Sequence, residues 1–126
     1  MISLLLLACA PTEIEMSSEV LGCRDWNPSE DYTPTLEIVR DGADILISRN
    51  YVDQYCDADF TPTLDVLSQY KISIRESWVV QSNDCSSCSA PTVRLHDYQG
   101  DFLEFWWYIG ESAISFNVIN TDELNE

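Results

Sequence analysis

A repeated segment is the feature that most restricts the fold of this chain. "DYTPTLEIVRDGADILI", which begins at Asp31, resembles "DFTPTLDVLSQYKISI", which begins at Asp59, with an offset of 28 residues. A fainter third copy, "APTVRLHDYQGDFLEF", begins at Ala90. Repeats of this length are supersecondary units that share one core. The domain is therefore expected to be built from β-hairpin repeats of about 28 residues.

The first two units have the alternation of β-hairpins. Asp41 and Gly42 form a two-residue turn signal, because a type I′ turn needs positive φ at both central positions. Closing the hairpin there places Ile38 opposite Ile45 and Leu36 opposite Ile47. These four aliphatic side chains then lie on the same face of the hairpin. In the second unit the same alternation puts Tyr70, Ile72 and Ile74 on one face, and Lys71, Ser73 and Arg75 on the other.

The third unit leads into the most aromatic stretch of the chain, "FLEFWWYIG" at residues 102–110. Gly110 and Glu111 predict a type II′ turn after this stretch. Closing that turn sets three apolar pairs opposite each other, Trp107 with Ile114, Phe105 with Phe116 and Leu103 with Val118. Phe105 and Trp107 are therefore expected to point into the core.

A loop over residues 99–101 is expected to pair the aromatic strand with the strand before it. This hairpin would set His96 opposite Glu104 and Leu95 opposite Phe105. A shorter turn would instead bury the Glu104 carboxylate against Leu95, which costs free energy. Since no segment keeps a helical period, the expected fold is all-β, an immunoglobulin-like antiparallel β-sandwich or a small barrel.

The N-terminus contains a short apolar segment of the kind that directs export. Leu6, Leu7, Ala8 and Cys9 follow a short apolar run and resemble the lipobox of bacterial lipoproteins. The resemblance implies a signal segment at residues 1–8, lipidation of Cys9, and a lipidated tether over residues 9–22. It further implies an exported cell-envelope protein, and Ala10 after the cysteine leans toward the outer membrane. The single β domain is then expected at residues 23–120, before an acidic C-terminal tail at residues 121–126.

The cysteine count agrees with export. Setting Cys9 aside leaves an even set of four, Cys23, Cys56, Cys85 and Cys88. In an exported domain this set predicts two disulfides, of which three connectivities are possible. The favoured one joins Cys85 with Cys88 and Cys23 with Cys56. A redox dithiol or a zinc site is disfavoured, because the single C-x-x-C lies in a loop-like sequence without a second close pair.

The charge balance excludes some partners. With 22 acidic and 6 basic residues, the net charge of −16 repels nucleic acid and anionic membrane surfaces, so membrane contact is expected through the lipid alone. The acids are expected to form a solvated surface, and the alternative is a calcium site at Asp53, Asp57 and Asp59, which lack the regular spacing of a calcium loop. No metal or cofactor is therefore expected. His96 is the only histidine and no serine lies in a nucleophile motif, so an enzyme is not expected either.

One face of the aromatic strand is expected to point outward. The candidate binding residues on it and on the strand before it are Arg94, His96, Tyr98, Phe102, Trp106 and Tyr108. Such a face is either covered by another part of the chain or is a contact surface, because aromatic and Arg side chains anchor interfaces. The expected function is therefore a non-enzymatic module that binds or scaffolds an envelope protein. The alternative is a carbohydrate-binding module that stacks a surface glycan on the same rings.

The lipobox resemblance generates a first prediction. The mature chain should begin at Cys9 and carry an acyl mass, because signal peptidase cuts before the lipidated cysteine in that family. Mass spectrometry of the membrane fraction checks this. An intact Met1 terminus without added acyl mass would contradict it.

Overall fold

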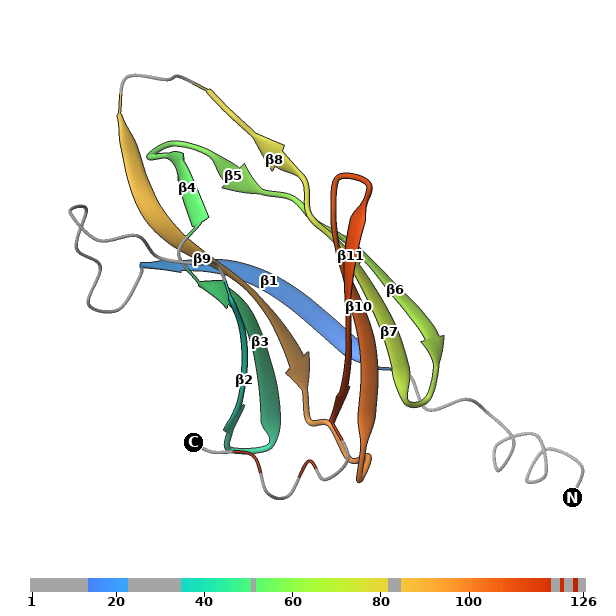
Figure 1. The fold of residues 1–126 in the computed structure, drawn as a ribbon. Coiled ribbons are helices and arrows are strands. Elements are labelled where there is room, and N and C mark those ends of the chain that lie inside the picture. The colour runs from blue at the N-terminus through green and yellow to red at the C-terminus, as the bar shows by residue number, and fades with distance from the viewer. Residues whose placement is uncertain are drawn as a thin grey trace, which may run out of the picture.

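The computed structural model describes residues 14–22, 35–50, 52–81, 85–118, 121 and 124, and the elements within them are strands (Figure 1). One sheet, called the β9 sheet, has the order β1-β9-β3-β2, with β4 pairing β9 as well. Its strands are β1 (Glu15–Gly22), β2 (Thr35–Asp41), β3 (Asp44–Asn50), β4 (Val52–Tyr55) and β9 (Ser86–His96).

The second sheet, called the β10 sheet, has the order β11-β10-β7-β6. Its strands are β6 (Thr63–Ser68), β7 (Lys71–Arg75), β10 (Leu103–Ile109) and β11 (Ser112–Val118). A small third sheet pairs β5 (Asp59–Phe60) with β8 (Trp78–Val79) near one end of the sandwich (Figure 1).

The core lies between the β9 and β10 sheets. The fully buried hydrophobic side chains alternate along β3, β7, β10 and the end of β9: Ile45, Ile47, Val93 and Leu95 from the β9 sheet, and Ile72, Ile74, Leu103, Phe105 and Trp107 from the β10 sheet. This is the period of two that places alternate residues on one face of a strand. The predicted all-β sandwich is confirmed, and among the described strands neither sheet closes into a barrel.

The first two repeat units are hairpins, as predicted. In the second, Ile72 and Ile74 are buried while Lys71 and Arg75 are exposed. In the first, the turn lies one residue later than expected, so that Asp41 faces Asp44. Gly42 has φ of +62° at the first central position, and a II′ turn needs positive φ there alone.

This later turn changes the pairing but not the faces of the first hairpin. Ile38 pairs with Ile47 instead of Ile45, a shift of two positions. Because side chains alternate with a period of two, a shift of two leaves each aliphatic side chain on its predicted face.

Of the two predicted neighbours of the aromatic strand, β10, one is confirmed and the other is wrong. The turn at Gly110 and Glu111 sets Trp107 opposite Ile114 and Phe105 opposite Phe116, as expected, and Gly110 has φ of +59°. The predicted hairpin with the preceding strand is wrong. β9 pairs with β1, β3 and β4, whereas the second neighbour of β10 is β7, which runs parallel to it.

The crossover from β9 to β10 has local causes. Asp97 adopts a left-handed φ of 49°, and the backbone N–H of Tyr98 donates to the carbonyl of Ala43 at 3.0 Å. The Tyr98 ring turns into the core, and its hydroxyl donates to the Phe102 carbonyl at 2.6 Å. Residues 98–102 form a loop around this ring, and the loop connects β9 in one sheet to β10 in the other. Leu95 and Phe105 therefore both enter the core, but from different sheets.

Two expectations about the chain ends also change. The predicted tether over residues 9–22 includes β1, which pairs with β9 from Glu15 to Gly22. Within the predicted acidic tail, Thr121 is fully buried and its backbone N–H donates to the Asp101 carbonyl at 2.8 Å. Leu124 packs against the core. The signal segment, Cys9 and Cys23 lie outside the described residues.

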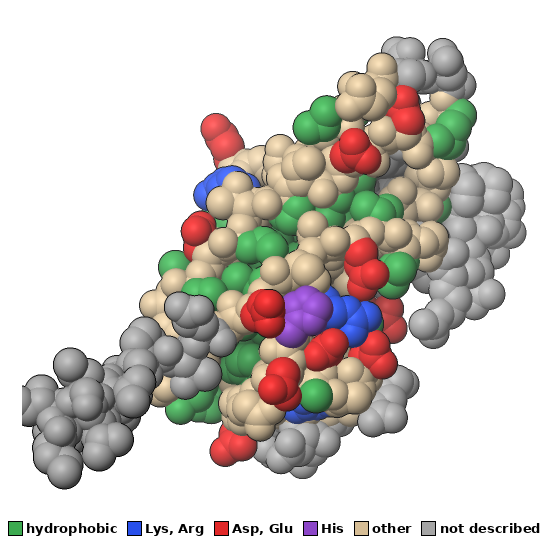
Figure 2. Space-filling view, turned by 180° about the vertical axis from the view of Figure 1, so that it is seen from behind, with side chains coloured by type: hydrophobic (Ala, Val, Ile, Leu, Met, Phe, Trp, Pro, Cys, Tyr) green, Lys and Arg blue, Asp and Glu red, His purple; other side chains and the backbone are tan. Residues whose placement is uncertain are grey.

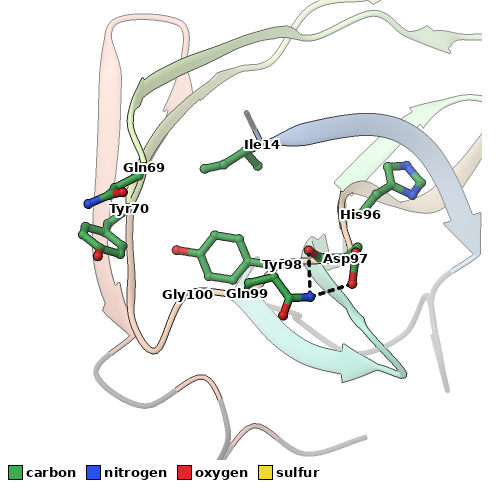
Figure 3. Close-up of a pocket in the computed structure, with 8 residues that line it drawn as sticks. All are labelled: Ile14, Gln69, Tyr70, His96, Asp97, Tyr98, Gln99 and Gly100. Carbon is green, nitrogen blue, oxygen red and sulfur yellow. Dashed lines mark hydrogen bonds between the residues drawn. The ribbon is translucent and has the colours of Figure 1, made fainter. Parts of the chain in front are cut away.

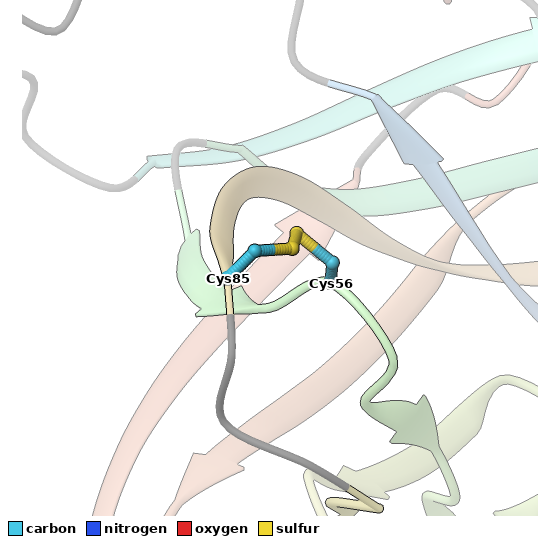
Figure 4. The surroundings of a disulfide bond; sticks show 2 residues. All are labelled: Cys56 and Cys85. Carbon is cyan, nitrogen blue, oxygen red and sulfur yellow. A yellow bond between two sulfur atoms is a disulfide. The ribbon is translucent and has the colours of Figure 1, made fainter.

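The favoured disulfide pairing is wrong. Cys56, in the turn after β4, is bonded to Cys85 at the start of β9, with Cα atoms 5.6 Å apart (Figure 4). Cys85 and Cys88 cannot pair, because three extended residues span about 10 Å and a disulfide tolerates Cα separations of up to about 7 Å. Cys88 is itself disulfide-bonded. A bridge across 29 residues stabilises the domain by roughly 3–4 kcal/mol on the chain-entropy account.

The alternation along β10 generates the second prediction. Phe105→Ala should lower the free energy of unfolding by about 3–5 kcal/mol, because a fully buried ring leaves a cavity. Trp106→Ala should cost much less, because this side chain points outward and is only half-buried. Denaturant unfolding of the two variants measures the difference. Equal losses of unfolding free energy in the two variants would mean that side chains on both faces of β10 are packed in the core.

Candidate functional site

The six predicted binding residues do not share one face. Arg94 and His96 lie on the outer face of the β9 sheet, whereas Trp106 and Tyr108 lie on the outer face of the β10 sheet. Phe102 is exposed next to β10, and Tyr98 is buried in the core. The crossover between β9 and β10 causes this division, because it moves the two strands into different sheets.

The outer face of the β10 sheet keeps an aromatic and cationic group. It consists of Lys71, Arg75, Phe102, Trp106 and Tyr108 and is called the aromatic face; Tyr70, in the β6–β7 turn, stacks on Phe102 at its edge. Parallel pairing of β7 with β10 sets Arg75 beside Tyr108, and the guanidinium lies 4.4 Å from the ring centroid. The ammonium of Lys71 lies 5.9 Å from the Trp106 centroid. Each exposed contact of this kind contributes about 0.5–1 kcal/mol.

The aromatic face is open to solvent. Phe102 is 44% exposed although its ring stacks on Tyr70 with centroids 4.3 Å apart. Lys71 forms an ion pair with Glu104 at 3.3 Å. Arg75 is exposed and donates to the Gly110 carbonyl at 3.3 Å, and none of the ion pairs within the described part of the chain includes it. Its charge is available to a partner.

The outer face of the β9 sheet has a different chemistry. Figure 2 shows the single histidine there, beside a basic side chain and among several acidic ones. The group consists of Ser17, Asp41, Asp44, Arg94 and His96 and is called the His96 cluster. The Ser17 hydroxyl lies 2.7 Å from Nε2 of His96, and the Asp44 carboxylate lies 3.9 Å from Nδ1.

Arg94 and Asp44 hold each other in the His96 cluster. The guanidinium lies 2.8 Å from Asp44 and 3.0 Å from Asp41, and Glu19 lies 3.5 Å away. The backbone N–H of Asp97 donates to Asp44 at 2.8 Å. This hydrogen bond, followed by the one from Arg94, lowers the pKa of the Asp44 carboxyl below its ordinary value. The Asp44 carboxylate is therefore ionised and fixed in orientation.

A pocket of about 180 Å³ lies beside the crossover. It is lined by Ile14 just before β1, by the β6–β7 turn and by residues 96–100 at the end of β9 and after it, and Tyr98 reaches across it toward Tyr70 (Figure 3). Burial, with a smaller contribution from Tyr70, raises the pKa of Tyr98 to about 12. Gly100 is required here, because a Cβ atom would lie 2.7 Å from the Tyr98 hydroxyl oxygen. His96 borders the pocket, but its ring points away from it (Figure 3).

A buried ion pair joins the sheets behind these surfaces. Arg49, in β3, donates from Nε and from Nη2 to the carboxylate of Glu76, which follows β7. The indole N–H groups of Trp78 and Trp107 donate to the same carboxylate. The Glu76 side chain is only 5% exposed. Its burial acts to raise its pKa, but the hydrogen bonds from Arg49, Trp107 and Trp78 outweigh this and lower the pKa below 4.5.

Several of these residues were not expected from the sequence. Arg49 and Glu76 carry no local signal, because their pairing depends on how the sheets stack. Ser17 was assigned to the tether, and the sequence "EMSSEVLG" of β1 lacks the alternation that marks a strand. The side chains of β1 are mostly exposed on both faces, so no alternation is required of it.

Metal-binding clusters and membrane-spanning helices are both absent from the described residues. Within them, no group of three or more His, Cys, Asp or Glu side chains is arranged to hold a metal ion. No helix in this part of the chain is long and apolar enough to cross a membrane.

Comparisons with known proteins do not add a function. No protein-family model matches the chain, and no curated protein or solved structure matches it significantly. The function must therefore be inferred from the two outer faces and the charges on them.

The buried ion pair generates the third prediction. Glu76→Gln should lower the free energy of unfolding by about 3–5 kcal/mol, because it leaves the Arg49 charge buried without a counter-ion. Since folding lowers the pKa of Glu76, its contribution is complete above about pH 4.5 and is lost as the pH falls through the lowered pKa. The difference between the wild type and the variant should therefore shrink in acid.

Denaturant unfolding across this pH range measures the effect of Glu76→Gln. Glu104→Gln is the matched control, because the Lys71–Glu104 pair is partly exposed and contributes at most about 1 kcal/mol. A Glu76→Gln loss as small as that of the control would show that the buried pair does not hold the sheets.

Proposed function

We propose that this chain is a lipid-anchored domain of the cell envelope that binds another protein through the aromatic face. The observation that carries the proposal is the group of exposed Phe102 and half-buried Trp106 and Tyr108 beside Arg75, which has no ion-pair partner among the described residues. Aromatic and Arg side chains are the residues that most often dominate protein interfaces.

The charges on the aromatic face suggest the chemistry of its partner. Arg75 favours a partner that presents a carboxylate next to an apolar patch. The net charge of −16 repels a partner that is acidic as a whole. The expected partner is therefore neutral or basic overall, with a single acidic group at the point of contact.

The anchor proposal rests on the lipobox-like residues ending at Cys9 and on the disulfide chemistry. A bridge such as Cys56–Cys85 is typical of proteins in oxidising compartments. Because β1 begins at Glu15, a lipid on Cys9 would keep the domain within about 20 Å of the membrane, the reach of six extended residues. The partner is then expected at the membrane surface, and an outer-membrane location is part of the proposal.

A carbohydrate-binding function is the alternative. Trp106 and Tyr108 alternate along β10 and so lie on the same face, as a sugar platform requires. Arg75 and Lys71 already lie over these rings, however, and a stacked sugar would have to displace them. A protein partner can use the rings and the cations together, and it is favoured for that reason.

The aromatic face generates the fourth prediction. Trp106→Ala should weaken binding of the envelope partner by about 30-fold or more, the effect of losing an interface anchor worth about 2 kcal/mol. Val20→Ala, an exposed substitution in β1 on the other sheet, should leave binding unchanged. Cross-linking in envelope preparations identifies the partner, and titration with the purified partner gives the dissociation constants.

Two results would count against protein binding at this face. Equal affinity of the Trp106→Ala and wild-type proteins for the partner would remove the aromatic face from the interface. Binding of neutral glycans that is lost in Trp106→Ala would instead favour the carbohydrate alternative.

A further inference from the structure

We propose that Ser17 is a nucleophile activated by His96, with Asp44 as the supporting carboxylate, and that this site accepts acyl groups from uncharged or cationic esters. The site lies on the sheet opposite the aromatic face, so it is independent of the binding function proposed above. It departs from the sequence-based expectation that the chain is not an enzyme, which rested on the lack of a serine motif.

The fold brings these three residues together from three strands. β9 lies between β1 and β3 in the sheet. Ser17 is the cross-strand partner of Arg94, and His96 is the partner of Glu15, so Ser17 and His96 share one face. Ile45 pairs with Leu95, and the residue before it, Asp44, therefore lies beside His96 on that same face.

The distances fit general-base activation of a hydroxyl. Ser17 Oγ lies 2.7 Å from His96 Nε2, which is within hydrogen-bond reach of a nucleophile and its base. The Asp44 carboxylate lies 3.9 Å from Nδ1, an ion-pair distance rather than a hydrogen bond. A negative charge on that side favours the tautomer with its proton on Nδ1. Nε2 is then left with a lone pair that accepts the Ser17 proton.

Asp44 is held in the position that this role requires. Arg94 and the backbone N–H of Asp97 each approach it at 2.8 Å, so that its carboxylate is ionised and oriented. When His96 takes up the serine proton it becomes positively charged, and Asp44 stabilises that charge. At 3.9 Å from Nδ1, Asp44 acts on the imidazolium by its charge and not by a hydrogen bond that would orient the ring.

The reaction proceeds in two balanced steps. Ser17 Oγ attacks the acyl carbonyl carbon, its proton passes to His96 Nε2, and the C–O bond to the leaving alcohol breaks as His96 returns the proton to that alcohol. Water then attacks the acyl-serine with His96 as base, which releases the carboxylic acid and restores the serine hydroxyl.

The surroundings restrict the substrate class. Glu15 lies opposite His96, and Glu19 and Asp41 lie on either side of Arg94. These carboxylates repel an anionic ester, so the substrate should be neutral or cationic. Ser17 is exposed, and the site is on an open sheet face rather than in a deep pocket. Small acyl groups carried on a larger molecule are therefore the expected substrates.

The experiment measures acyl transfer from p-nitrophenyl acetate to the intact protein. We expect acetylation of Ser17, detected by peptide mass mapping, with a rate that falls at least tenfold in Ser17→Ala and in His96→Gln. Asp44→Asn should give a smaller loss, because its contribution is electrostatic. Ser18→Ala is the matched control, because this adjacent exposed serine alternates to the other face and should leave the rate unchanged.

The outcomes separate activation from ordinary surface chemistry. Unfolding curves of each variant must match the wild type, and where Asp44→Asn unfolds, the His96→Gln result decides. Acetylation that is equal in wild type and His96→Gln, or that maps to lysine or Ser18 with Ser17 unmodified, would overturn the proposal. The Ser17–His96 contact would then be a cross-strand hydrogen bond without catalytic consequence.

Discussion

The buried pair of Arg49 and Glu76 is the interaction on which the arrangement of the sandwich depends. Arg49 belongs to the β9 sheet, Glu76 follows β7 in the β10 sheet, and the Trp78 indole reaches the same carboxylate from the small third sheet. Charges removed from water cost free energy unless they are paired and hydrogen-bonded. Here that requirement is met by donors from all three sheets, which meet at the Glu76 carboxylate. The backbone N–H of Glu76 also donates to the Tyr108 carbonyl at 3.0 Å, which ties the pair to β10.

The two outer faces follow from that arrangement. Once Trp107 donates to Glu76, its strand must turn Phe105 and Trp107 inward and Trp106 and Tyr108 outward. The parallel neighbour β7 then sets its cations beside the outward rings. On the other sheet, β9 collects polar groups from β1 and β3 around His96. A domain with a net charge of −16 thus has one aromatic face, on which Lys71 and Arg75 lie over the rings, and one acidic face with a histidine.

Local features of the sequence predicted the hairpins well. The Gly110 turn and the alternation of β7 are encoded within a few residues, and both are as expected. The turn of the first hairpin was displaced by one residue, because Gly42 suits the first position of a II′ turn as well as the second position of a I′ turn. The hairpin expected between β9 and β10 failed for another reason. The alternation of apolar and polar residues assigns Leu95 and Phe105 to the core. It does not indicate whether their strands pair within one sheet or lie in two sheets that face each other across the core.

The sequence alone determined the all-β class, the inward and outward side of each well-patterned strand, and the aromatic surface that results. These properties depend on a period of two and on turn residues, which act over short distances. Only the tertiary structure decided the pairing of Cys56 with Cys85, the ion pair of Arg49 and Glu76, and the contact of Ser17 with His96. The last of these joins residues 79 positions apart through an edge strand with little alternation of its own. Such contacts are set by which strands stack and pair, and that choice is made by burial and hydrogen-bond satisfaction over the whole chain.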